Sequence, residues 1–128
     1  KKEFLNYFEI SENFIFYLHS VSEEQSTSFN LHYFKKDTPA DVLTVPLYRN
    51  FDEIKKLDKN NVEILGDLFI YRKLIKQNAL KYKKTTIEEL QLVLIHGLLH
   101  LVGFSHENED RLKKIENKIL EKVWKNAK

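Results

Sequence analysis

One apolar stretch, interrupted by histidines at a regular spacing, limits what this chain can fold into more than any other feature. Residues 91–102 contain eight large aliphatic side chains together with His96 and His100. A run of this length, without a polar face and richer in Leu than in β-branched residues, predicts a buried helix rather than a strand. Gly103 follows at the position where a helix is expected to end. The sequence therefore predicts an apolar helix over residues 86–102 at the centre of the fold.

The two histidines lie four residues apart, and a third follows the glycine. On a helix His96 and His100 share one face, and His106 comes after the turn at Gly103. Imidazole nitrogen binds Zn²⁺ at roughly 2.0–2.1 Å, and a catalytic zinc ion usually has three protein ligands. A lone buried histidine is usually a core residue hydrogen-bonded to the backbone, but that explanation fits three histidines at these spacings less well. We therefore expect His96, His100 and His106 to bind one Zn²⁺ ion.

The residue after the first histidine distinguishes this pattern from that of a peptidase. HxxxHxxGxxH is the ligand pattern of the metzincin proteases, in which the general base is a glutamate directly after the first histidine. Here that position holds Gly97. Because glycine within a helix costs about 1 kcal/mol relative to alanine, Gly97 indicates either a close approach to the helix backbone or simple helix crowding. The pattern thus retains the three histidines expected to bind the metal, but it lacks the glutamate base and disfavours a zinc peptidase.

Three segments of the chain resemble the YbeY family. Residues 96–106, HGLLHLVGFSH, resemble its HGxLHLxG(Y/F)DH motif, and residues 30–43, NLHYFKKDTPADVL, resemble NxxYRxKDxPTDVLSF. Residues 66–70 resemble its GD(I/L)VI strand, so the resemblance covers roughly residues 13–125. It implies a bacterial metal-dependent endoribonuclease that cleaves single-stranded RNA in ribosomal RNA processing and in ribosome maturation and quality control. Its partners would be ribosomal RNA and ribosomal proteins.

Two departures from the family pattern keep other functions open. The family arginine falls on Phe34, and the aspartate before the third histidine falls on Ser105. The resemblance implies that the arginine serves RNA cleavage or binding, so its loss favours an alternative: a non-catalytic, zinc-stabilised assembly factor that binds RNA or the ribosome. A metallohydrolase with another substrate class, such as peptide or small ester bonds, is the remaining alternative.

The charge is distributed unevenly along the chain. Residues 65–128 carry 13 basic and 8 acidic side chains, whereas residues 1–64 carry 8 basic and 11 acidic ones. Lys and Arg are the side chains that bind the phosphates of polyanions. We expect Arg72, Lys73 and Lys76 to contact substrate, with Arg72 stabilising phosphate charge and water activated by the metal as the catalytic group. The competing interpretation is a solvated helix face.

The remaining patterns predict an α+β fold in one domain, residues 1–128. Strand-like segments cover residues 13–18, 41–47 and 63–71, and helical ones cover 22–34, 72–82, 86–102 and 107–125. The spacings Ser22 to Gln25 and Thr85 to Glu88 predict capping boxes at two helix starts. The expected architecture is a small mixed sheet of three to four strands, packed against helices, with the apolar helix at the centre.

The composition indicates an ordinary cytoplasmic protein. The 128 residues include no cysteine, so neither disulfides nor thiolate ligands are available, and histidine and carboxylate remain as metal ligands. No apolar run reaches the roughly 18 residues that a membrane span needs, and the first residues do not resemble a secretory signal. We expect no contact with a membrane.

Overall fold

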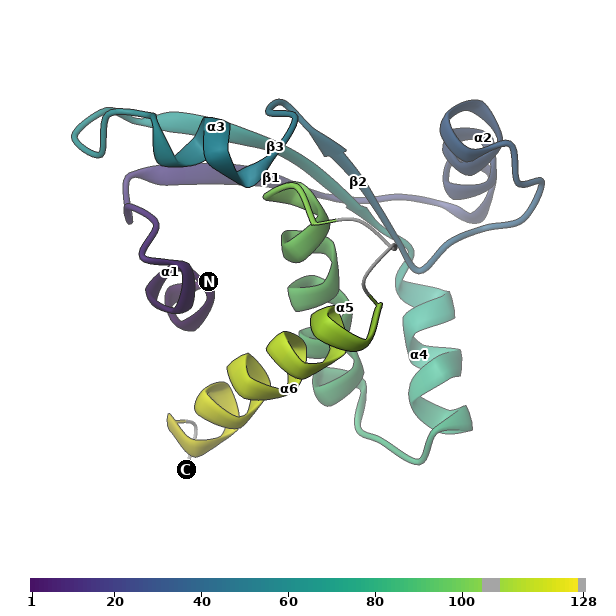
Figure 1. Ribbon diagram of the computed structural model, residues 1–128. Coiled ribbons are helices and arrows are strands. Elements are labelled where there is room, and N and C mark those ends of the chain that lie inside the picture. Colours follow the sequence, from purple (N-terminus) through teal and green to yellow (C-terminus); the bar gives the residue numbers. More distant parts are fainter. Residues whose placement is uncertain (105–108, 127–128) are drawn as a thin grey trace.

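The computed structural model describes residues 1–104 and 109–126 (Figure 1). Six helices and three strands make up this part of the chain, which confirms the predicted α+β class. In chain order the elements are α1 (Lys2–Phe8), β1 (Phe14–Ser20), α2 (Glu23–Phe34), β2 (Val42–Pro46), α3 (Phe51–Lys55), β3 (Glu63–Ile70), α4 (Arg72–Lys81), α5 (Thr86–Leu101) and α6 (Glu109–Asn126).

The sheet is mixed, with β3 at its centre. β1 pairs with β3 in parallel, and β2 pairs with β3 antiparallel on the other side. Pro46, which has no N–H to donate, ends β2, and this edge position agrees with the rule for proline in sheets. Opposite Pro46 lies Gly66, with φ 145°, where an added Cβ would lie 2.3 Å from the carbonyl oxygen of Val45. Only glycine allows β2 and β3 to approach so closely here.

The central helix α5 covers one face of the sheet. Figure 1 shows α5 beneath the strands, between α4 on one side and α6 on the other. At Gly97 an added Cβ would lie 3.1 Å from the side chain of Val42 and 3.2 Å from that of Leu68. This close approach of the sheet explains a glycine in the middle of an apolar helix. On the opposite face the ring of Phe69 lies 4.8 Å from that of Phe29 in α2.

Local signals at the helix ends agree with the sequence. Ser22 with Gln25, and Thr85 with Glu88, form complete capping boxes, so α2 and α5 begin where predicted. α5 is the most deeply buried helix, and its side chains at Leu99 and Leu101 are fully buried. In the described part of the chain no helix combines the length and the apolar character needed to cross a membrane.

Candidate metal centre and adjoining cleft

α5 places His96 and His100 one turn apart, with the two rings in an edge-to-face arrangement. The two Nε2 atoms lie 3.1 Å apart, and the ring planes are inclined at 76°. The predicted pairing of these two side chains on one helix face is thus present. His106 and Ser105 lie outside the described residues, and the role of His106 stays a prediction.

The other nitrogen of each ring is held by a fixed partner. Nδ1 of His96 lies 2.5 Å from Oε1 of Glu116 in α6, and Nδ1 of His100 lies 2.8 Å from the carbonyl oxygen of Phe104. A carbonyl oxygen can only accept, so Nδ1 of His100 carries the proton. The Glu116 carboxylate accepts in the same way from His96. In the neutral form of each ring, Nε2 then carries the lone pair that could bind a metal ion.

This arrangement fits a metal ion. Two nitrogen ligands at 2.0–2.1 Å from one tetrahedral zinc ion lie about 3.3 Å apart, close to the 3.1 Å that separates the two Nε2 atoms. Metal-binding histidines usually donate their other N–H to a carboxylate or a backbone carbonyl, and both kinds of partner occur here. Residues 1–104 and 109–126 contain no cluster of three or more His, Cys, Asp or Glu side chains that could hold an ion. The expectation that His106 supplies a third ligand stays a prediction.

The histidine pair lines a cleft of about 580 Å³. This volume is within the usual range for small-ligand sites, roughly 300–1,000 Å³. The cleft is walled by the end of α2, the loop that follows it, β2, the loop before α3 and the C-terminal end of α5. Its lining residues are Asn30, Phe34, Lys36, Ala40, Asp41, Val42, Leu43, Thr44, Pro46, Arg49, His96, His100, Gly103 and Phe104.

The environment of Gly97 opposes the peptidase alternative. Its missing side chain would point at Val42 and Leu68 of the sheet, at contact distances of 3.1 and 3.2 Å. Its carbonyl oxygen accepts a hydrogen bond from Oγ1 of Thr44 at 3.2 Å. A glutamate at this position, like the general base of zinc peptidases, would have to displace the side chains of Val42 and Leu68.

The predicted basic residues lie elsewhere. Arg72, Lys73 and Lys76 are exposed on α4, and none of them lines the cleft. α4 packs against α5 (Figure 1), where Ile75 of α4 belongs to one apolar cluster with Val93 of α5. The contact of the three basic residues with substrate stays a prediction and would have to involve RNA that extends beyond the cleft.

Two residues of the site were not predicted from the sequence. Glu116 is buried on α6, between Leu112 and Leu120 on the same face. A charged residue within an apolar stripe was the signal that could have revealed it. Arg49 lies in a polar segment without a recognisable pattern, and nothing in the sequence connects it with the histidines.

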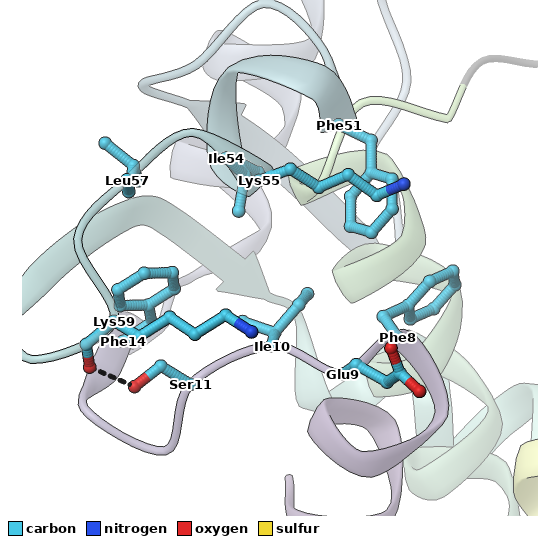
Figure 2. A pocket seen from close by; sticks show the side chains of 10 residues that line it. All are labelled: Phe8, Glu9, Ile10, Ser11, Phe14, Phe51, Ile54, Lys55, Leu57 and Lys59. Carbon is cyan, nitrogen blue, oxygen red and sulfur yellow. Dashed lines mark hydrogen bonds between the residues drawn. The ribbon is translucent and has the colours of Figure 1, made fainter.

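A second, smaller cavity lies between α1 and α3 (Figure 2). Its volume is about 230 Å³, and it shares no lining residue with the histidine cleft. At its edge the hydroxyl of Ser11 donates to the carbonyl oxygen of Lys59 at 2.7 Å. The aromatic rings of Phe8, Phe14 and Phe51 form much of its wall.

The fold and the site together define an α+β protein whose central helix carries a paired-histidine centre beside a cleft. A sequence profile of the family described as "Endoribonuclease YbeY" matches residues 2–125. The chain thus belongs to the YbeY endoribonuclease family, a family of hydrolases, and the resemblance seen in the sequence is confirmed.

Individual relatives agree with this assignment. The chain is 36% identical over 129 residues to an Endoribonuclease YbeY of Mycoplasmoides gallisepticum, covering 98% of this chain and 74% of that protein. It is 34% identical over 103 residues to one of Buchnera aphidicola, covering 78% of this chain and 62% of the relative. The solution structure of TM1509 from Thermotoga maritima matches with a TM-score of 0.59 and 26% identity, over 98% of this chain and 85% of that one.

Proposed function

We propose that this chain is a zinc-dependent endoribonuclease that cleaves single-stranded RNA during ribosomal RNA processing in the cytoplasm. His96, His100 and His106 would hold the ion, and ribosomal RNA, with ribosomal proteins, would be the partner. The observation that carries the proposal is the pair of Nε2 atoms 3.1 Å apart, at the wall of a cleft. Membership of the YbeY family supports the substrate class.

The chain's own residues would prepare the site. Glu116 and the carbonyl of Phe104 fix the tautomers of the two histidines and hold both rings in place. A bound zinc ion would supply Lewis acidity, polarising a phosphoryl oxygen and making water a better nucleophile near neutral pH. The cleft beside the rings leaves room for a strand of RNA to place a phosphate there.

The test is cleavage of a single-stranded ribosomal RNA fragment by protein purified without a polyhistidine tag. We expect cleavage with zinc, loss of cleavage with a chelator, and recovery when zinc is added back. His96→Ala and His100→Ala should each bind less zinc and lose at least 100-fold in cleavage rate, because each removes one ligand. His32→Ala is the matched control, since His32 is exposed on α2 and does not line the cleft.

Phe34 favours a second candidate function. It lines the cleft at the position where the resemblance places the family's arginine. The absence of that arginine supports a zinc-stabilised assembly factor that binds RNA without cutting it. This alternative would be established if the wild-type protein bound the ribosomal fragment but failed to cut it with every divalent metal tested. Zinc content without RNA binding would contradict both candidates.

A further inference from the structure

The described residues that line the cleft include two basic side chains, Lys36 and Arg49, and one carboxylate, Asp41. Oδ1 of Asp41 accepts the backbone N–H of Val42 at 2.8 Å. The guanidinium of Arg49 forms no ion pair or hydrogen bond with any residue in the described ranges. Glu53, four residues further on, uses its carboxylate to accept the backbone N–H of Arg49 at 2.8 Å.

The loop that carries Arg49 is fixed against the end of α5. Gly103, with φ 101°, lies so close to this loop that an added Cβ would be 2.6 Å from Cα of Asn50 and 2.8 Å from the nitrogen of Phe51. The side chain of Asn50 accepts the N–H of Glu53 and caps α3. The backbone next to Arg49 is thus in direct contact with Gly103, just after the C-terminal end of α5.

Contacts on the other side of Arg49 fix the loop further. The hydroxyl of Tyr48 donates to Oε2 of Glu63 in β3 at 3.0 Å. Burial, and then the neighbouring Glu63 carboxylate, raise the pKa of Tyr48, so the hydroxyl keeps the proton that it donates. The N–H of Leu47 bonds to the carbonyl oxygen of Leu65 at 2.9 Å. Arg49 is therefore a charged side chain on a rigid support rather than one on a loose loop.

We propose that the guanidinium of Arg49, which lines the same cleft as the His96–His100 pair, binds a phosphate of the RNA strand there. Guanidinium is always charged in proteins, and its planar fork matches two phosphate oxygens. Phe34 lines the same cleft, and among the described residues that line it Arg49 carries the guanidinium. This inference rests on the proposed RNA substrate.

The test measures binding separately from cleavage. Zinc-loaded protein is titrated into a fluorescent 2′-O-methyl single-stranded oligoribonucleotide at several salt concentrations, with intact probe verified on a gel. We expect Arg49→Ala to weaken binding about 10-fold and to reduce the salt slope by about 0.7, the value for one phosphate contact on a single strand. Arg49→Gln should behave the same way. Lys56→Ala, which removes one exposed charge from the end of α3 outside the cleft, should leave the slope closer to wild type.

A rescue variant sharpens the test. Because Phe34 lines the same cleft, Phe34→Arg in the Arg49→Ala background should recover most of the lost affinity. Equal affinity and slope for wild type and Arg49→Ala would overturn the inference, as would equal losses in Arg49→Ala and Lys56→Ala. The proposed endoribonuclease fails instead if wild-type protein cuts no RNA, an outcome that leaves the binding comparison decisive for Arg49.

Discussion

Oε1 of Glu116 in α6 lies 2.5 Å from Nδ1 of His96 in α5, so a buried carboxylate of the C-terminal helix orients one ring of the histidine pair. Loss of such an outer partner typically weakens metal binding 10- to 100-fold. We expect Glu116→Gln to weaken zinc binding about 10-fold and Glu116→Leu nearer to 100-fold, because glutamine keeps an acceptor oxygen and leucine does not. Competition against a chromophoric zinc chelator measures the affinity without reference to cleavage.

Glu121→Gln is the matched control for this prediction. Glu121 is exposed on the same helix, so its variant should bind zinc like the wild type. If Glu116→Gln and Glu116→Leu also bind zinc with wild-type affinity, the short contact with His96 has no role in holding the ring for a metal.

Gly97 lies in α5 between the two histidines, and Gly103 lies just after the end of this helix. Substitution of each by alanine should change the free energy of unfolding by a different amount. At Gly103 a Cβ would meet backbone atoms of residues 50 and 51 at 2.6 and 2.8 Å, and φ is 101°. We expect Gly103→Ala to lower the free energy of unfolding by about 2–4 kcal/mol. At Gly97 the contacts are side chains at 3.1 and 3.2 Å, and alanine gains about 1 kcal/mol in helix propensity.

Gly97→Ala should therefore change the free energy of unfolding by less than about 1 kcal/mol. Urea unfolding of the two variants and the wild type, with the slope compared as well as the midpoint, measures both values. If both substitutions lowered the free energy of unfolding equally, the contact of Gly103 with Asn50 would restrict this residue no more than the side-chain contacts restrict Gly97.

The elements that could be predicted are those encoded by neighbouring residues. Capping boxes join residues three apart, so the starts of α2 and α5 are visible in the sequence at Ser22 and Thr85. The pairing of His96 with His100 follows from the helix period in the same way. Residue type also explains why Pro46 lies at a sheet edge, because a missing N–H limits where proline can lie.

The relationships that could not be predicted join residues distant in the chain. Sheet order depends on strands that meet only in the folded protein, and β3 lies between two strands that precede it in sequence. Glu116 reaches His96 only because α6 packs back across α5. Arg49 reaches the cleft only because Gly103 lets the loop before α3 approach. His106, which follows from spacing alone, stays a prediction.

Leu99 tests whether α5 is the central support of the core. Its side chain is fully buried among the apolar residues of α1, β3 and α6. We expect Leu99→Ala to cost about 2–5 kcal/mol in unfolding free energy, the range for deletion of a buried leucine side chain. Leu80→Ala, at a site 76% exposed on α4, should change stability by less than about 0.5 kcal/mol. Chemical denaturation measures both, and a cost for Leu99→Ala as small as that for Leu80→Ala would contradict this account of the core.

Glu88 should make the start of α5 sensitive to acid. The backbone N–H of Thr85 donates to its carboxylate at 3.0 Å, and this bond, followed by that with the Thr85 side chain, lowers the pKa of Glu88. A lowered pKa in the folded state stabilises the fold above the unfolded value of about 4.3, and this stabilisation is lost as the pH falls through the folded pKa. Glu88→Gln keeps the capping box, as Gln25 does in α2, but removes the titration. We therefore expect the melting temperature of the wild type to fall more than that of Glu88→Gln as the pH is lowered from 6 to 3. Parallel melting curves for the two proteins would contradict a role for this carboxylate in acid sensitivity.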